Sequence, residues 1–211
     1  MSIKLGVVMD PIADITYKKD TTLGMLWAAQ DRNWSLYYME QPDLYLDQGV
    51  ARANMQALQV FRDPAAWYQL QPAEDRALAD LDVILMRKDP PFDNEYVYST
   101  YILEEAEQQG TLIVNRCQSL RDCNEKVFAT HFPQCCPPVL VSADMERLKA
   151  FHQAQQDAIF KPLDGMGGDA IFRVKPGDPN VSVILEMLTQ HGRQTIMAQK
   201  FIPQISDGDK R

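Results

Sequence analysis

Apolar residues occur along the chain in short continuous runs, separated by stretches with helical spacing. The first run, residues 3–9, is almost entirely apolar and ends at Asp10 and Pro11. A run of this kind is typical of a strand that is buried on both faces of a parallel sheet. The same argument predicts further strands at residues 35–40, 82–86 and 111–115.

Helices are predicted between these strands. Asp20 or Thr21 can cap a helix that continues to about Gln30. Residues 95–109 carry apolar side chains at helical spacing, with acidic residues on the other side. They precede Gly110, and glycine commonly follows the end of a helix.

This alternation of strands and helices predicts an α/β fold with a doubly wound parallel sheet of about four strands. Residues 43–61, with a turn at residues 47–49, predict an antiparallel hairpin added to that sheet. The pattern holds as far as residue 122, so we expect a first domain over residues 1–122.

The pattern changes in the second half, and residues 123–211 are expected to form a separate α+β domain. The elements predicted there are, in chain order, a helix through Lys126 and Phe128, a strand at residues 139–142, a helix capped by Ser142 or Asp144 that ends near Gln155, a helix at residues 181–190 and a strand at residues 195–202.

A glycine-rich stretch in this second domain is the strongest candidate for a binding site. Two apolar runs, residues 158–160 and 170–174, flank a loop that contains three glycines in four positions, and Lys161 stands at the base of the loop. The pattern predicts a β-hairpin with a glycine-rich tip. Such a tip can be an ordinary tight turn, or its backbone N–H groups can point at phosphate oxygens.

A second candidate lies in the first domain, where residues 87–93 (RKDPPFD) follow a predicted strand. The two prolines exclude a continuing strand or helix, so the charged residues stand on a stiff loop. In open α/β sheets the carboxyl ends of the strands are where ligands bind. Arg87 and Asp89 could instead form a surface ion pair of little energetic value.

Charge and cysteine content exclude several classes of function. The chain carries 29 acidic and 21 basic residues, a net charge of −8. This argues against nucleic acids and anionic membranes as partners but is compatible with a small anionic ligand. The four cysteines and three histidines show no metal-binding spacing. Reduced thiols, and the lack of any run resembling a signal peptide or membrane span, predict a cytoplasmic protein.

Five separated segments resemble, in order, those of the bacterial glutathione synthetases, which belong to the ATP-grasp ligase family, and the resemblance runs the whole length of the chain. They are residues 9–12 (MDPI), 82–93 (DVILMRKDPPFD), 119–126 (SLRDCNEK), 161–168 (KPLDGMGG) and 207–211 (DGDKR). The resemblance implies that the second domain is an incomplete ATP-grasp domain, an α+β nucleotide-binding subdomain.

The resemblance also implies roles for individual residues. Lys126 and Lys161 would contact the phosphates of ATP, and backbone groups at Lys200 and Ile202 would hydrogen-bond the adenine edge. Arg211 resembles a catalytic cation on the phosphate side. The remaining implied positions are Gly165, Met166, Gly167 and Gly168 as a flap over the triphosphate, Gln199 and Phe201 in the hinge strand, Asp209 at the ribose or phosphate, and Asp10, Arg87 and Asp89 near the peptide substrate.

The implied reaction joins glycine to γ-glutamylcysteine. The peptide carboxylate attacks the γ-phosphate of ATP, and the glycine amine then displaces phosphate from the acyl phosphate. The partners would be these three small molecules and, for a full-length chain, further copies of itself. Family members also use Mg²⁺, whose ligands lie in a remaining third of the family chain. We therefore expect the 211-residue chain alone to have little or no ligase activity.

Two alternatives remain open. One is a sister ATP-grasp ligase that joins another acid to another amine. The other is a nucleotide-binding or dimerising module without turnover. An oxidoreductase is less favoured, because no glycine fingerprint follows the first predicted strand.

Overall fold

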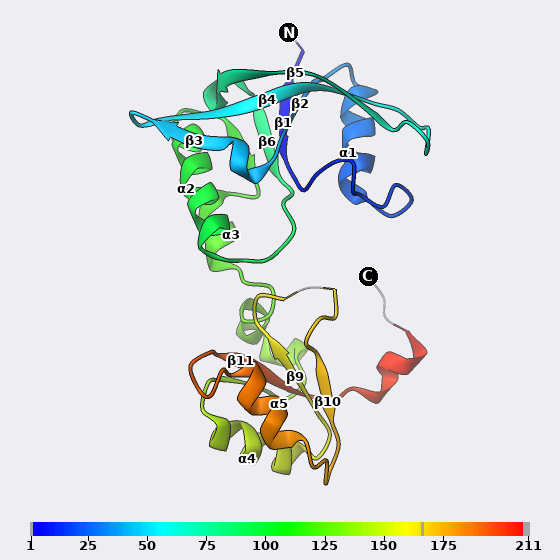
Figure 1. Cartoon of the computed structure of the whole chain (residues 1–211), viewed down its shortest axis with the longest axis vertical. Coiled ribbons are helices and arrows are strands. Elements are labelled where there is room, and N and C mark those ends of the chain that lie inside the picture. Colours follow the sequence, from blue (N-terminus) through cyan, green and yellow to red (C-terminus); the bar gives the residue numbers. More distant parts are fainter. Residues whose placement is uncertain (1, 166, 209–211) are drawn as a thin grey trace. The chain divides into compact units, whose positions relative to one another are not determined.

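The computed structural model describes residues 2–165 and 167–208 of the 211-residue chain. The chain divides into two compact units, Met1–Arg121 and Asp122–Arg211. Figure 1 shows both units.

The described part of unit 1 is built on a seven-stranded sheet. Its elements are β1 (Lys4–Val8), α1 (Thr21–Gln30), β2 (Ser35–Met39), η1 (Gln41–Asp43), β3 (Leu44–Asp47), β4 (Val50–Val60), β5 (Tyr68–Ala77), η2 (Leu78–Asp80), β6 (Val83–Met86), α2 (Asn94–Gln108), β7 (Leu112–Val114) and α3 (Cys117–Asp122), where η marks a short 3₁₀ helix.

Strands β2, β1, β6 and β7 lie side by side in parallel, which confirms the predicted doubly wound core. Strands β3 and β4 form the predicted hairpin, and β4 joins the edge of β2 in antiparallel orientation. The sheet is therefore mixed and larger than the sequence predicted. Strand β5, which pairs with β4, was not predicted, because its mostly exposed sequence is polar and contains Pro72.

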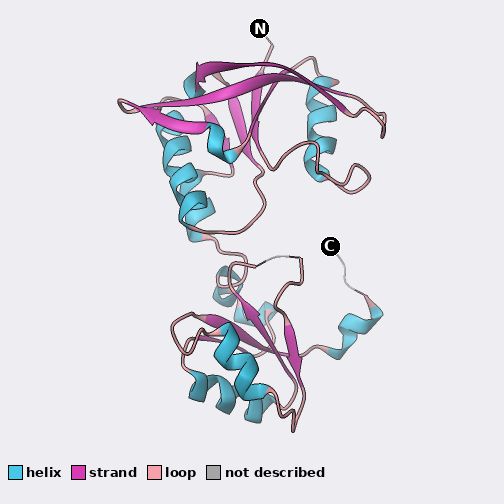
Figure 2. Cartoon of the chain, in the orientation of Figure 1, coloured by secondary structure: helices cyan, strands magenta, loops and turns pink. Residues whose placement is uncertain are grey.

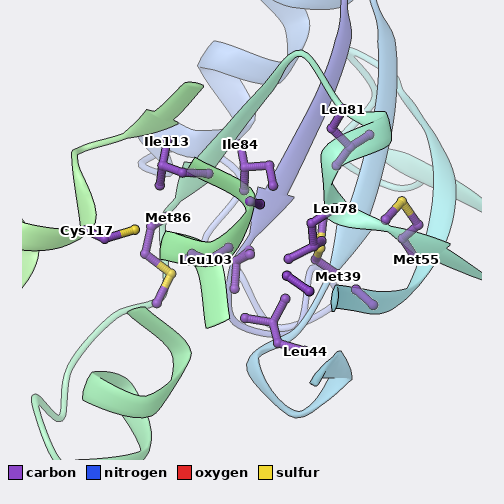
Figure 3. Packing of buried hydrophobic residues seen from close by; sticks show 14 residues of the cluster. Met39, Leu44, Met55, Leu78, Leu81, Ile84, Met86, Leu103, Ile113 and Cys117 are labelled. Atoms are coloured by element: carbon purple, nitrogen blue, oxygen red, sulfur yellow. The ribbon is translucent and has the colours of Figure 1, made fainter. Parts of the chain in front are cut away.

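Helices α1 and α2 lie on opposite faces of this sheet (Figure 1). Successive strand residues point to opposite faces, so Leu5 and Val7 pack in the cluster that includes α1, whereas Val8 packs in the cluster that includes α2. Figure 3 shows the α2 cluster. Asp20 caps α1, its side chain accepting from the Leu23 N–H at 2.7 Å, as predicted.

The described part of unit 2 contains a four-stranded sheet in the order β10-β9-β11-β8, and each neighbouring pair is antiparallel (Figure 2). The predicted glycine-tipped hairpin is confirmed as β9 and β10. The elements are η3 (Phe128–His131), η4 (Pro133–Cys135), β8 (Val139–Ser142), α4 (Met145–Gln155), β9 (Ala158–Pro162), β10 (Phe172–Val174), α5 (Val181–Leu188), β11 (Ile196–Lys200) and η5 (Pro203–Asp207).

The predicted helix through Lys126 and Phe128 is wrong. The Asn124 side chain accepts hydrogen bonds from the backbone N–H groups of Lys126 and Val127, both at 3.0 Å, and so holds this stretch in a turn. Asparagine competes with helical hydrogen bonding in this way. The short 3₁₀ helices η3 and η4 follow this turn.

The two faces of the unit 2 sheet differ in what covers them. Ala158 and Phe160 of β9 and Ala198 of β11 are fully buried with residues of α4 and α5. Because side chains alternate along a strand, Lys161 and Gln199 point to the opposite face. That face carries the pocket that Lys161 and Gln199 line.

We predict that Gln30→Ala lowers the free energy of unfolding of unit 1 by about 1–3 kcal/mol. The Gln30 side chain accepts from the Val60 N–H at 2.9 Å and donates to the Val60 carbonyl at 2.7 Å, so its loss leaves two backbone groups of a buried residue unpaired. The three tryptophans, at positions 27, 34 and 67, all lie in unit 1, so urea unfolding followed by tryptophan fluorescence reports this unit.

The matched control is Gln108→Ala, at an exposed position near the end of α2, for which we expect a change within about 0.5 kcal/mol. Equal stabilities of the two variants would contradict the assignment of the Gln30 contacts.

Candidate functional site

A pocket of about 480 Å³ lies on unit 2, within the size range of small-molecule sites. Its walls include Lys161 of β9 and Gln199 of β11, together with Ile202 just beyond β11. Lys200 and Phe201 also line it. The structure therefore brings together, around one cavity, Lys161 and all the candidate hinge residues.

Lys161 is one of the two lysines that line this pocket. Its Nζ donates to the Gln199 Oε1 at 2.8 Å. Burial, and secondarily repulsion from the charge of Lys126, lowers the pKa of the Lys161 ammonium below its usual range. The charged form is therefore held without a full counter-charge, and an anionic group that entered the pocket would stabilise it.

Lys126 anchors the base of the glycine-rich loop. Its Nζ donates to the carbonyls of Leu163 and Gly165 at 3.1 and 2.6 Å, and it pairs with Glu125 at 3.1 Å. The Asn124 Nδ2 also donates to the Leu163 carbonyl, at 3.3 Å. The start of the loop is thereby tied to the segment that carries Lys126.

The tip of the loop requires glycine. Gly167 and Gly168 have φ angles of +71° and +89°, a conformation that other residues adopt only with strain. A Cβ added at either position would meet no atom within 4 Å, so the requirement comes from the backbone and not from packing. The loop thus presents backbone groups with little side-chain cover.

At the other end of the pocket, Lys200 lies opposite a proline. The Lys200 N–H donates to the Pro138 carbonyl at 2.9 Å. In an antiparallel pair the return bond would come from the N–H of residue 138, which proline lacks. The Lys200 carbonyl consequently receives no ladder bond from Pro138, and Lys200 is one of the residues that line the pocket.

Three candidate residues, Met166, Asp209 and Arg211, lie outside the described residues. The candidate metal is not placed either: within residues 2–165 and 167–208, no group of three or more His, Cys, Asp or Glu side chains could hold a metal ion. The described residues therefore do not assign ligands to Mg²⁺, and no step is routed through it.

The candidate substrate residues of unit 1 meet at the carboxyl ends of β1 and β6. The Asp10 carboxylate accepts from the Asp89 N–H at 2.8 Å and pairs with the Lys88 ammonium at 2.7 Å. Arg87 points toward the start of α1, donating to the Thr21 and Thr22 hydroxyls at 3.2 and 3.0 Å. The predicted surface pair between Arg87 and Asp89 does not occur among these contacts.

The sequence reading missed Lys88 and Pro138. Lys88 lies between the candidate substrate residues Arg87 and Asp89. Its positive charge at the end of the same strand could have indicated that it belongs to this group. The sequence pattern alone does not single out Pro138. Its role depends on the register between β8 and β11, which the sequence does not reveal.

Comparison with known proteins identifies the family. Residues 3–121 match the prokaryotic glutathione synthetase N-terminal domain, and residues 125–211 match the prokaryotic glutathione synthetase ATP-grasp domain. The chain belongs to the prokaryotic glutathione synthetase family. The resemblance predicted from the five segments is thereby confirmed.

Individual relatives agree with this result. The chain is 63% identical over its whole length to a glutathione synthetase of Pseudomonas aeruginosa, of which it covers 67%. It is 64% identical to a glutathione synthetase of Pseudomonas putida, of which it also covers 67%. The chain thus spans about two thirds of the length of these glutathione synthetases.

Solved structures agree on the fold. The D-cycloserine synthetase DcsG matches 96% of the chain with a TM-score of 0.62 at 13% identity, and the match covers 60% of that protein. An ATP-grasp protein of Sphaerobacter thermophilus matches 95% of the chain with a TM-score of 0.58 at 16% identity, over 64% of its own length. The predicted ATP-grasp fold is confirmed.

Cytoplasmic location and self-association remain predictions. No helix among the described residues is both long and apolar enough to span a bilayer.

We predict that binding of ADP is accompanied by proton uptake at Lys161. The lowered pKa of this ammonium in the free protein should rise when a phosphate group replaces the missing counter-charge. The complex then binds more protons than the free protein, so affinity falls as pH rises from the lowered pKa toward the ordinary value near 10.5. Calorimetry in buffers of different ionisation enthalpy measures the uptake.

The control is Lys161→Arg, which keeps the charge but does not titrate in this range. The Lys161→Arg variant should show no proton uptake on binding ADP at pH values between the lowered pKa of Lys161 and about 10.5. Equal proton uptake by both proteins would contradict the assignment to Lys161.

Proposed function

We propose that this protein binds ATP in the unit 2 pocket and uses it to ligate glycine to γ-glutamylcysteine, giving glutathione, ADP and phosphate. The observation that carries the proposal is Lys161, a partly buried cation with a lowered pKa, on the floor of a cavity next to the hinge residues. Membership of the prokaryotic glutathione synthetase family supports the choice of reaction.

Lys161 and the glycine-rich loop would form the phosphate end of the site. The reaction begins when the peptide carboxylate attacks the γ-phosphate, and negative charge builds up on the phosphoryl oxygens. Lys161 and Lys126 would stabilise that charge, and Lys126 would also hold the base of the loop in place. A loop of Gly165, Gly167 and Gly168 closing over the acyl phosphate would exclude water, which would otherwise hydrolyse it.

The hinge would form the base end of the site. Adenine has an exocyclic amino donor and ring nitrogen acceptors on one edge. The Lys200 carbonyl, which misses its ladder partner opposite Pro138, suits the amino group. The Ile202 N–H, two residues further along, would donate to a ring nitrogen. Gln199 would link the two ends of the site, because its side chain accepts from Lys161.

The peptide would bind near the carboxyl ends of β1 and β6. Arg87 would attract a carboxylate of γ-glutamylcysteine, and Asp10 and Asp89 would attract its amino group. Asp10 is held for this by Lys88 and by the Asp89 N–H. Asp209 and Arg211 stay predictions from the family resemblance, with Asp209 assigned to the ribose or phosphate and Arg211 to the transferring phosphate.

A second candidate is nucleotide binding without turnover. It is favoured by one observation, that residues 2–165 and 167–208 contain no group of three or more His, Cys, Asp or Glu side chains that could hold a metal ion. A triphosphate without its metal ions is poorly neutralised. A sister ligase with another acid and amine remains a third candidate.

Phosphate release distinguishes these candidates. The chain, extended to the full length of its relatives, is incubated with ATP, Mg²⁺, γ-glutamylcysteine and glycine, and each component is omitted in turn. Release that needs both the peptide and glycine supports the proposed ligase. Nucleotide binding without release supports the non-catalytic module, and release with another acid or amine, but not with these substrates, supports a sister ligase.

We predict that Lys161→Ala weakens ATP binding by at least about tenfold. One hydrogen bond from a charged group contributes about 1.5–3 kcal/mol, and 1.4 kcal/mol already corresponds to tenfold. Calorimetric titration measures the affinity. The matched control is Lys149→Ala on α4, which removes a lysine paired only with Glu146 on the surface of the same unit. Lys149→Ala should bind as the wild type does. Equal affinities of all three proteins would refute the phosphate assignment.

A further inference from the structure

Two residues outside the predicted site, Arg173 and Asp157, contact the predicted hinge residue Phe201 just beyond the end of β11. The Arg173 guanidinium of β10 lies over the Phe201 ring, 3.5 Å from its centroid. The same guanidinium makes two hydrogen bonds to the Asp157 carboxylate, at 3.0 and 2.7 Å. The backbone carbonyl of Asp157 in turn accepts from the Phe201 N–H at 2.9 Å. Phe201 is therefore held through both its ring and its backbone.

The arrangement lies on the face of the sheet that carries the pocket. Arg173 is paired with Ile159 across β10 and β9, and Ile159 is paired with Gln199 across β9 and β11. Directly paired residues in antiparallel strands point to the same face, so Arg173 and Gln199 share a face. Both Ile159 and Phe201 line the pocket.

Stability alone does not account for this arrangement. The Arg173 and Asp157 side chains are 40% and 32% exposed, and ion pairs of this exposure contribute little to folding. A guanidinium held by two parallel hydrogen bonds, however, has a fixed plane, and a fixed plane can orient an aromatic ring. What Arg173 can control is the position of Phe201, the residue between Lys200 and Ile202.

We propose that Arg173 is a positioning residue for the base-binding hinge. It acts through Phe201, and Asp157 fixes its guanidinium. The contacts of Arg173 with Phe201 and Asp157 keep the Lys200 carbonyl and the Ile202 N–H at the spacing that the edge of an adenine base requires. This inference deepens the proposed function and rests on it. Arg173 should therefore affect how tightly the adenine base is bound and should not affect how tightly the phosphates are bound.

The test compares a ligand that has a base with one that has none. ADP should engage both the hinge and Lys161, whereas inorganic tripolyphosphate should engage the phosphate end only. We expect Arg173→Met to weaken ADP binding by about fivefold or more, the factor that a lost cation–π contact corresponds to. Its affinity for tripolyphosphate should stay within about twofold of the wild type. Asp157→Asn should have a smaller effect in the same direction.

Two further variants separate positioning from a general loss of structure. Arg147→Met removes another arginine from an exposed aspartate pair, with Asp144 on α4, and should leave both affinities unchanged. In a Phe201→Leu background, Arg173→Met should weaken ADP binding no further, because Arg173 acts through that ring. An equal loss of ADP and tripolyphosphate binding, an effect that persists without Phe201, or no effect on ADP would each overturn the proposal.

A measurement without ligand keeps the proposal testable if the wild type binds no nucleotide, an outcome that would count against the proposed function. Amide hydrogen exchange followed by NMR reports the Phe201 and Lys200 N–H bonds to Asp157 and Pro138 directly. Arg173→Met should speed exchange at these two amides by about fivefold or more while Met197, inside β11, stays protected. Unchanged exchange at Phe201 would show that Arg173 does not hold the hinge.

Discussion

The candidate site depends on the side-chain alternation of β9 and β11. One face of these strands is buried with α4 and α5 through Ala158, Phe160 and Ala198. With a period of two, Lys161 and Gln199 must point the other way. A shift of one residue in β9 would move Lys161 into the apolar core, and the same shift in β11 would move Gln199 there. The packing of the core thus fixes the position of the charge.

The charge of Lys161 at that position makes the face suitable for binding an anion. Lys161 is partly desolvated and lies near the charge of Lys126, and its hydrogen bond is to a neutral amide rather than to a carboxylate. An acidic partner would have neutralised it and removed the attraction for an anion. The glycine-rich loop then adds backbone groups that no side chain covers. A chain with a net charge of −8 can in this way still attract a phosphate locally.

Much of the fold could be predicted from local patterns, because the apolar runs and the caps at Asp20 and Asp144 are properties of neighbouring residues. The prediction failed where local and long-range effects compete. A helix was predicted through Lys126, but the Asn124 side chain accepts hydrogen bonds from the Lys126 and Val127 N–H groups and holds the segment in a turn. Strand β5 has a polar sequence and is stabilised by its pairing with β4. The Lys161, Lys200 and Ile202 assignments came from family resemblance, whereas the pairing of Arg173 with Asp157 and Phe201 needed the register of three strands.

The central claim is that the nucleotide binds on the open face of unit 2. It is tested most directly by amide NMR of the chain during titration with ADP. The account predicts that the largest shift changes occur at Lys161, in the loop at Gly167 and Gly168, and at Lys200 and Ile202, while residues 87–89 of unit 1 stay unshifted. Changes concentrated in unit 1, or a bound nucleotide that leaves Lys161 and Ile202 unshifted, would contradict it.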